Sequence, residues 1–386
     1  MSRRTINFHV VGCGLSGPGY PNAINTLGLL RNLPGIAIKD NAYWLGEDFH
    51  LWKLVSGTLR QRIRRTGQLA WGNAVALLRL RRIRRDDTLY LPYPSLPLLW
   101  LLSWLPSHRQ PHCIADAYIT LWDTLYQDRQ LGRRGSLASR LLLRAESRAL
   151  RTAYRIVVDT QANADHVSRL FGVDRQRIVA LPLALDSATL PAQAVTTASA
   201  REGNKSVRVL FIGTFVPLQG TEVIARTIAL LRDNTDMDFM LIGDGQQATA
   251  AAPLLKNHPR LTWLRGWQSP DMLAMAVAEA DICLGVFGGP DKAARVLPFK
   301  LYMALAAGKC VVTQQDFSVP DGCPPPPMAT CAPDPGALAA CLTRLARDAT
   351  VRQHLGEQGA AYFQQYLGPE RLRQAWHALV FGDCEG

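Results

Sequence analysis

Residues 207–213, Val-Arg-Val-Leu-Phe-Ile-Gly, are the strongest structural signal in this chain. They form an apolar run that ends in glycine, and a loop at 214–220 separates them from helical apolar spacing over residues 221–231. A second apolar run, residues 239–243, also ends in glycine. A strand followed by a glycine turn and a helix directs backbone N–H groups and the positive end of the helix at an anion. The sequence therefore predicts parallel strands with an anion-binding edge in its second half.

Three cations accompany the last such unit. Residues 295–312 run from a helical pattern into an apolar strand, and Lys292, Arg295 and Lys300 lie beside the start of the helix. A helix N-terminus is itself positive, so cations next to it strengthen the attraction for an anionic group such as a diphosphate.

Taken in this order, the segments resemble the retaining family 4 glycosyltransferases of the GT-B fold. The matching segments are Pro-Leu-Gln-Gly at 217–220, Ile-Gly-Asp-Gly at 242–245, Gly-Trp at 266–267, the block 298–308 and the stretch 333–338. The resemblance covers residues 205–366 well and is weaker over the first half. It implies an α/β architecture of two Rossmann-like domains that face each other across a cleft. It also implies transfer of a sugar from a nucleotide diphosphate sugar to a glycan or lipid-linked acceptor, with retention of anomeric configuration.

The resemblance further implies that the second half holds the donor. We expect no metal ion, because the sequence has no DxD-type acidic pair in the right context and the cations can stabilise the leaving diphosphate, and we expect no cofactor. The expected donor-binding residues are Gly213, Thr214, Gln219, Gly220, Gly243, Asp244, Gly266, Trp267, Lys292, Arg295, Lys300 and Met303.

Three of these positions depart from the family pattern. Thr214 and Gln219 are neutral where many relatives carry arginine and lysine, and Met303 stands where a glutamate normally holds the donor ribose. Methionine cannot accept the hydrogen bonds of ribose hydroxyls as a carboxylate does. A catalytically silent GT-B protein that serves as a partner or scaffold in glycan assembly is therefore an alternative, and a nucleotide-sugar epimerase on the same fold is another.

Length and composition agree with two domains. The 386 residues are 48% hydrophobic and 19% charged, which is typical of a globular chain with large cores. We expect an acceptor-side Rossmann-like domain over 1–190, a linker over 191–206, and a nucleotide-sugar-binding domain over 207–386 whose last helix is placed to return to the first. Eight cysteines show no CxxC spacing, and the N-terminus runs directly into a strand. Both features favour the cytosol.

The positive charge is confined to the first domain, since residues 1–190 carry +13 and residues 191–386 carry −1. Arginines at 60, 62, 64, 65, 79, 81, 82, 84 and 85 alternate with Leu, Ile and Trp at nearly helical intervals. This pattern favours an amphipathic helix on an anionic membrane surface, on the cytosolic face, over a solvated helix. No nucleic-acid-binding motif accompanies it. The apolar stretch 89–106 contains four prolines and so does not span a membrane, and its Trp100 and Trp104 belong either to a core helix or to a membrane interface.

Two further features of the first half bear on function. Gly12, Gly14 and Gly17 form a GxGxxG pattern after a strand, but prolines follow it and the helix is expected to begin only near Asn22. By resemblance, this loop approaches the donor phosphates; a dinucleotide-binding loop is the alternative.

Acids follow a later strand of the first half. Asp116 and Asp123 come after the strand 111–116, where α/β folds place their chemistry, and are our candidates for handling the acceptor. Their alternative role is structural, as helix caps or in pairs with Arg129, Arg133 or Arg134.

Overall fold

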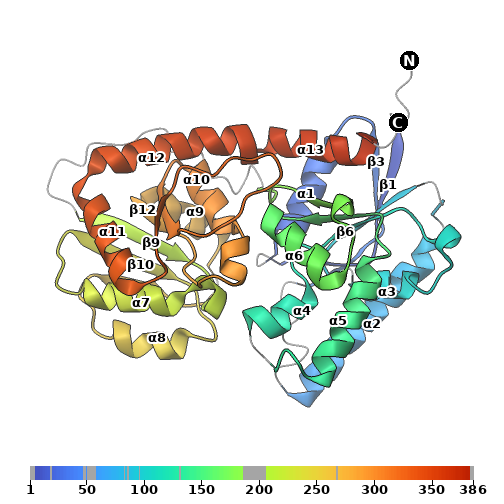
Figure 1. The fold of residues 1–386 in the computed structure, drawn as a ribbon, viewed down its shortest axis with the longest axis horizontal. Helices are drawn as coiled ribbons and strands as arrows, with labels where there is room; N and C mark the ends of the chain where they lie inside the picture. Colours follow the sequence, from blue (N-terminus) through green and yellow to red (C-terminus); the bar gives the residue numbers. More distant parts are fainter. Residues whose placement is uncertain are drawn as a thin grey trace. The chain divides into compact units, whose positions relative to one another are not determined.

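The computed structural model describes residues 5–17, 20–46, 49, 58–81, 83–84, 87–94, 96–129, 132–185, 206–266 and 268–382. The chain forms two compact units, one of Met1–Ala184 with Leu372–Gly386 and one of Leu185–Arg371. Each unit contains a six-stranded parallel sheet with helices packed on it (Figure 1). Residues 191–205 of the expected linker lie outside the described residues.

The sheet of the first unit has the order β3-β1-β5-β6-β7-β8, and all neighbours are parallel. This is a doubly wound order whose direction reverses between β1 and β5. The central strands are short, apolar and buried because helices cover both faces. The strands are β1 (Ile6–Val10), β3 (Ile36–Asp40), β5 (Thr88–Leu91), β6 (Cys113–Asp116), β7 (Arg155–Val158) and β8 (Ile178–Ala180).

The helices of the first unit begin and end at the residues that their sequence signals indicate. Thr58 and Gln61 form a capping box at the start of α2, and Gly172 ends α6 in the left-handed conformation that glycine favours. The expected start near Asn22 is confirmed. The elements are α1 (Asn22–Arg31), α2 (Leu59–Leu80), α3 (Leu96–Leu102), η2 (Ser107–Arg109), α4 (Leu121–Asp123), the π-helical η3 (Thr124–Asp128), α5 (Leu137–Leu150), α6 (Gln161–Phe171) and η4 (Arg175–Arg177).

The C-terminal helix α13 (Pro369–Phe381) belongs to the first unit from Leu372 onward. Trp376 is fully buried there and packs edge-on against Phe8 and Tyr90. The core of the first unit is thus completed by residues from the far end of the chain.

The sheet of the second unit has the order β11-β10-β9-β12-β13-β14, again all parallel. This is the Rossmann order, and it reverses between β9 and β12, which leaves a crevice at the carboxyl ends of these two strands. Phe211, Ile282 and Val312 are fully buried between the helix layers. The strands are β9 (Val207–Ile212), β10 (Met237–Ile242), β11 (Leu261–Leu264), β12 (Ile282–Leu284), β13 (Cys310–Gln314) and β14 (Ala329–Cys331).

The helices of the second unit alternate with its strands. Ser269 caps α9 and Asp334 caps α11, each accepting from backbone N–H groups of the first turn. The elements are η5 (Pro217–Gln219), α7 (Thr221–Leu230), α8 (Ala248–Leu255), α9 (Pro270–Glu279), η6 (Lys292–Arg295), α10 (Phe299–Ala306), α11 (Pro335–Arg347), α12 (Ala349–Tyr362) and the π-helical η7 (Phe363–Leu367).

Candidate functional site

The loops at the reversal point of the second sheet pack backbone against backbone. A Cβ atom on Gly243 would lie 2.1 Å from the Gly213 carbonyl oxygen, and one on Gly220 would lie 2.2 Å from the Phe287 carbonyl carbon. Gly220 and Gly243 also have positive φ angles of 67° and 130°. Only glycine meets both demands. The predicted glycines therefore bring the loops after β9, β10 and β12 together at one edge.

Lys300 lies in the first turn of α10, beneath this edge. Its Nζ donates to Gln219 Oε1 and, at 3.3 Å, to the Gly285 carbonyl oxygen. It also lies 3.9 Å from the centre of the Phe211 ring, and a Cβ on Gly213 would be 2.9 Å from it. The structure thus brings together Gly213, Gln219 and Lys300, three of the residues that were expected to bind the donor.

The contacts of Lys300 are all with neutral groups, an amide oxygen, a carbonyl and an aromatic ring. Burial lowers the pKa of its ammonium well below the ordinary lysine value. A partly buried cation that is held only by dipoles and a ring face keeps most of its attraction for an anion. The ammonium is therefore suited to a phosphate that lies on the glycine loops.

The other two predicted cations approach the same loops. Lys292 and Arg295 are in η6, which packs against η5 and hence close to Gln219. Lys292 is buried and Arg295 is partly exposed. The loop before η6 is clamped by Gln314, whose side chain accepts from Gly289 N and donates to Gly289 O, both at 3.0 Å.

The remaining donor candidates lie around or below this edge. Thr214 and Gly266 are exposed, and the exposed Asp244 carboxylate is 3.3 Å from Arg265 Nε. Met303 lies one turn after Lys300 on α10 and is only 7% exposed. Trp267 lies outside the described residues. Within the described ranges, no group of three or more His, Cys, Asp or Glu side chains is placed to hold a metal ion.

The first glycine loop has a packing role that sequence reasoning missed. Cys13–Leu15 (β2) and Tyr43–Leu45 (β4) form a two-stranded parallel pair. A Cβ on Gly14 would lie 2.3 Å from the Trp44 ring, so Gly14 makes room for that indole. Gly12 has a φ of 96°, which glycine adopts readily, and Gly17 is buried.

Asp116 is a buried carboxyl group at the carboxyl end of β6. Its Oδ1 accepts from Tyr118 N at 3.1 Å and its Oδ2 from the Tyr90 hydroxyl at 3.3 Å. Burial raises the pKa of Asp116 to about 7, despite hydrogen bonds that oppose the shift. A carboxyl group with a pKa near neutrality can take up or release a proton at physiological pH.

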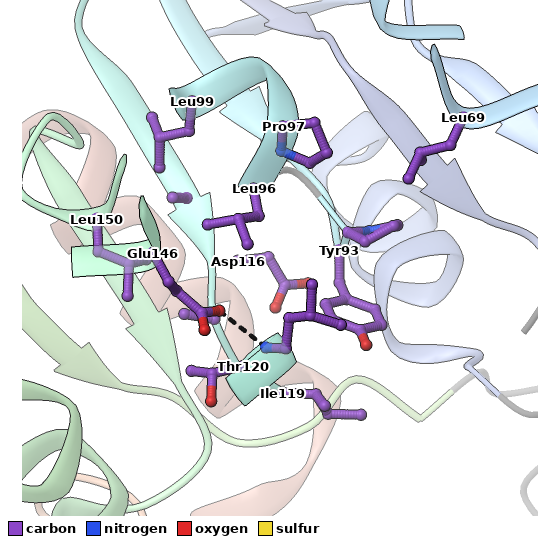
Figure 2. A pocket seen from close by; sticks show the side chains of 14 residues that line it. Leu69, Tyr93, Leu96, Pro97, Leu99, Asp116, Ile119, Thr120, Glu146 and Leu150 are labelled. Atoms are coloured by element: carbon purple, nitrogen blue, oxygen red, sulfur yellow. Dashed lines mark hydrogen bonds between the residues drawn. The ribbon is translucent and has the colours of Figure 1, made fainter. Parts of the chain in front are cut away.

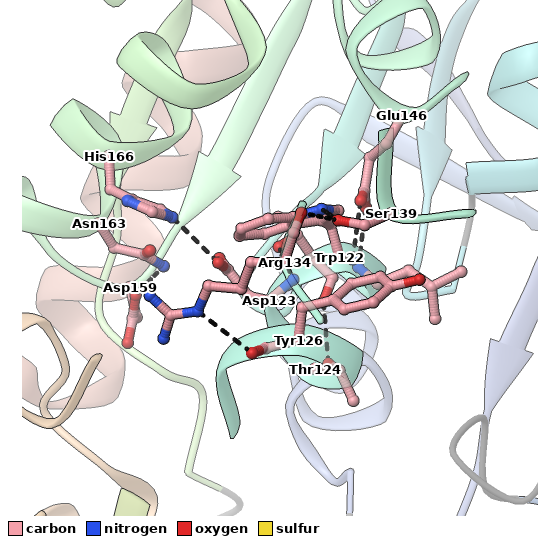
Figure 3. Close-up of polar contacts among 12 residues, drawn as sticks. Trp122, Asp123, Thr124, Tyr126, Arg134, Ser139, Glu146, Asp159, Asn163 and His166 are labelled. Atoms are coloured by element: carbon pink, nitrogen blue, oxygen red, sulfur yellow. Dashed lines mark hydrogen bonds and ion pairs between the residues drawn. The ribbon is translucent and has the colours of Figure 1, made fainter. Parts of the chain in front are cut away.

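Asp123 is paired with a histidine that sequence reasoning did not select (Figure 3). His166 Nε2 from α6 lies 3.0 Å from Asp123 Oδ1, and the Asp123 side chain is 2% exposed. Asp123 is the last residue of α4, whose first N–H groups, Leu121 N and Trp122 N, donate to the buried Glu146 carboxylate at 2.8 and 2.9 Å. Glu146 thus fixes the segment that carries Asp123, from a helix 25 residues further along the chain.

The outer sides of α2, α3 and α5 carry exposed apolar side chains among arginines. These helices contact one another in pairs, α2 with α3 and α3 with α5 (Figure 1). Trp71 is 65% exposed and Trp104 is 62% exposed, with the Arg148 guanidinium 3.9 Å from the Trp104 ring centre. Other members of this apolar-basic surface are Leu59, Arg60, Ile63, Arg64, Leu78, Trp100, Leu101, Leu137 and Leu141. None of the described helices is long and apolar enough to cross a membrane.

Comparisons with known proteins agree with the fold. Residues 206–348 match the family model described as Glycosyl transferases group 1. A search of curated proteins by sequence finds no match. Among solved structures, Anabaena HepE with UDP and glucose has a TM-score of 0.67 at 12% identity, over 98% of this chain and 100% of that chain.

Two further structures are similar over nearly the whole chain. Sucrose-phosphate synthase from Thermosynechococcus elongatus has a TM-score of 0.69 at 15% identity, over 98% of each chain. WaaG, a glycosyltransferase involved in lipopolysaccharide biosynthesis, has a TM-score of 0.59 at 13% identity, over 96% of this chain and 99% of that chain. The chain therefore has the fold of GT-B glycosyltransferases, with a glycosyl transferases group 1 domain in its second unit, as its sequence predicts.

Proposed function

We propose that this protein transfers a sugar from a nucleotide diphosphate sugar to an acceptor hydroxyl. The observation that carries the proposal is Lys300, a cation held by neutral groups beneath the glycine loops at the reversal point of a Rossmann sheet. Rossmann sheets bind nucleotides at that point, with the phosphates on the glycine turn. The family match over residues 206–348 and the UDP complex of HepE support a nucleotide sugar as the ligand.

In this proposal the donor diphosphate lies on the loop 213–220, with Lys300 and Arg295 as counter-charges. During transfer, the bond between the anomeric carbon and the diphosphate oxygen breaks, and its electron pair leaves with the diphosphate. The cations and loop N–H groups stabilise that developing charge, which is the role that a metal ion has in other transferases. We propose retention of anomeric configuration, as in the family that the sequence resembles.

Asp116 and Asp123 are the proposed acceptor-side residues. Asp116 has a pKa of about 7, so at neutral pH it accepts the proton that the acceptor hydroxyl loses as its oxygen bonds to the anomeric carbon. Asp123 is held by His166 and serves to orient the acceptor.

We further propose that the apolar-basic surface of α2, α3 and α5 rests on an anionic membrane on its cytosolic side. Exposed Leu, Ile and Trp side chains gain free energy when they enter the headgroup boundary, and each arginine near the surface adds about 1 kcal/mol. A membrane-bound enzyme meets a lipid-linked acceptor, which in this proposal carries a glycan intermediate. The WaaG likeness is compatible with such an acceptor.

A silent GT-B protein in a glycan assembly complex is the second candidate function. Met303 favours it, because this position is expected to hold the donor ribose and methionine offers no such hydrogen bond. The two candidates differ in turnover and not in fold.

A donor screen tests the main proposal. Calorimetry with UDP, GDP, ADP and TDP sugars identifies the base and sugar that bind, and product analysis by NMR with a lipid-linked acceptor reports transfer and anomeric configuration in the presence of a chelator. Binding of one donor with transfer supports the enzyme, whereas binding without transfer to any acceptor supports the silent protein. Failure of every nucleotide to bind would refute both.

A further inference from the structure

The first unit contains a pocket with mainly apolar walls beside Asp116 (Figure 2). Leu69 comes from α2, Leu96 from α3, Leu121 from α4 and Leu150 from α5. The pocket therefore lies where these four helices meet the carboxyl end of the sheet, which is the edge where α/β folds bind their ligands. Apolar walls of this kind favour an apolar occupant over a polar one.

Two carboxyl groups, Asp116 and Glu146, also line the pocket. Both oxygens of Glu146 are used, since Oε1 accepts from Leu121 N and Oε2 from Trp122 N. Asp116 accepts hydrogen bonds from Tyr118 N, from the Tyr90 hydroxyl and from the Tyr93 backbone, and the two oxygens of a carboxylate together offer about four acceptor positions. Asp116 is thus the polar group of this pocket with the capacity to meet a hydroxyl of a bound molecule.

The size of the pocket argues against a sugar ring as its occupant. Its cavity volume is about 50 Å³. At about 10–15 Å³ for each water-sized group, it has room for about four such groups, fewer than the ring atoms of a hexose. A short stretch of hydrocarbon chain fits this volume and these walls.

The surroundings of the pocket indicate where such a chain comes from. The helices α2, α3 and α5 that wall the pocket also carry the apolar-basic surface on their outer sides. Arginines on that surface attract anionic headgroups, and its exposed Trp and Leu side chains favour the acyl boundary of a bilayer. A molecule drawn from the membrane would therefore meet these three helices first.

We infer that this pocket takes the hydrocarbon segment next to the reacting hydroxyl of the acceptor, an alkyl or prenyl chain, with Asp116 accepting a hydrogen bond from that hydroxyl. The inference rests on the proposed sugar transfer and narrows its acceptor to a lipid alcohol, whose reacting hydroxyl lies next to its hydrocarbon chain, in place of a lipid-linked glycan. It makes Leu69, Leu96 and Leu121 determinants of acceptor specificity.

The probes for this inference are straight-chain primary alcohols from ethanol to octanol, titrated by calorimetry into the full chain. Each buried methylene should tighten binding about fourfold, from a transfer free energy of about 0.8 kcal/mol. The gain should stop after about four carbons, when the pocket is full. A series without chain-length dependence would overturn the inference.

Matched variants locate the binding. Leu69→Trp should fill the pocket from its half-buried position on α2 and abolish the dependence on chain length. Leu78→Trp, on the same helix but 59% exposed and away from the pocket lining, should retain it. If Leu69→Trp does not fold, Leu96→Trp from the α3 wall replaces it. If the pocket and surface variants both lost the dependence of affinity on chain length, or both kept it, the alcohols would bind elsewhere and the inference would be refuted.

Nucleotide binding separates this inference from the proposed function. The glycine loops and Lys300 belong to the second unit, so UDP affinity should be the same in the native chain and in each variant. A native chain that binds the alcohols as described but binds no nucleotide would contradict sugar transfer and leave the pocket assignment intact. A chain that binds UDP but no alcohol would refute the pocket assignment and leave the proposed sugar transfer intact.

Discussion

Replacement of Lys300 by methionine should raise the stability of the ligand-free protein and weaken nucleotide binding at the same time. Burial lowers the pKa of this ammonium, which means that the folded environment disfavours its charge. The groups around it, Gln219 Oε1, the Gly285 carbonyl and the Phe211 ring, are neutral. Methionine has a similar length and no charge, so it removes the desolvation cost and keeps the apolar contact with Phe211.

The loss in affinity follows from the contact that is removed. A hydrogen bond between a charged donor and a phosphate contributes about 1.5–3 kcal/mol, so Lys300→Met should weaken UDP binding by roughly 10- to 150-fold. At a UDP concentration 100 times its Kd, binding stabilises the native protein by about 2.7 kcal/mol, and the variant should lose about half of this gain if its affinity is 10-fold weaker and nearly all of it if 150-fold weaker. Without UDP the variant should therefore unfold at a higher temperature than the native protein, and the difference should shrink or reverse with UDP.

The stabilising effect should also depend on pH. A lysine whose pKa is lower in the folded state favours folding above its unfolded pKa, and this stability is lost as pH falls through the folded pKa. The advantage of Lys300→Met over the native chain should therefore be full below the folded pKa of Lys300, shrink as pH rises through it, and vanish near pH 10.5, the ordinary lysine pKa.

Denaturant unfolding and calorimetry with UDP measure both effects. Lys309→Met is the matched control, because Lys309 is a partly buried lysine just after α10 whose Nζ donates to the Ala278 carbonyl oxygen at 2.6 Å. The control should leave UDP affinity unchanged. An unchanged UDP affinity in Lys300→Met would refute the diphosphate assignment, and a strongly destabilised variant would show that Lys300 serves the fold.

Three further predictions concern acceptor handling, the ribose and the membrane. Asp116→Asn should abolish transfer and leave UDP affinity unchanged. Burial raises the pKa of Asp116 to about 7, so its contribution to stability is full below pH 3.8 and is lost as pH rises through 7. At pH 8 the variant should therefore be more stable than the native protein by up to about 4 kcal/mol, measured by denaturant unfolding. An asparagine variant with native turnover would exclude Asp116 from the reaction. Met303→Glu should tighten binding of UDP but not of pyrophosphate in calorimetry, because the added carboxylate accepts from ribose hydroxyls; an equal change for both ligands would place Met303 outside the ribose subsite. Arg64→Glu changes the charge by two units at about 1 kcal/mol each, so it should weaken binding to anionic vesicles at low salt by about 30-fold in a sedimentation assay. Arg169→Glu on α6 should leave this binding unchanged, and equal effects of the two variants would contradict membrane binding through α2.

The sequence was most informative about the second unit. The glycine turn after residues 207–213 and the helix from Phe299 are local patterns, and both are present where they were expected. The neighbours of Lys300 were only partly predictable. Gln219 and Lys300 were both expected to bind the donor, which is compatible with their contact, but the contact of Lys300 with the Phe211 ring depends on tertiary packing that no local pattern indicates.

The first unit was harder to predict because its important contacts join distant residues. His166 lies on α6 with no signal that relates it to Asp123, 43 residues earlier. In the sequence, Glu146 looks like an ordinary polar residue of an amphipathic helix. In the structure its carboxylate accepts hydrogen bonds from the first N–H groups of α4. The pairing of β2 with β4, which explains Gly14, involves strands too short to give a periodic pattern.

The return of α13 to the first unit bears on how the chain folds as it is made. The first unit is composed of residues from both ends of the chain, so it is incomplete when the ribosome has finished Ala184. Until Trp376 emerges, the cavity beside Phe8 and Tyr90 stays unfilled, which by analogy with the loss of a buried tryptophan costs about 3–5 kcal/mol. The second unit is continuous in sequence and is free to fold during that interval. The order of synthesis thus favours a nascent protein whose second unit is complete before its first, and the apolar core of the first unit stays exposed until the last helix docks.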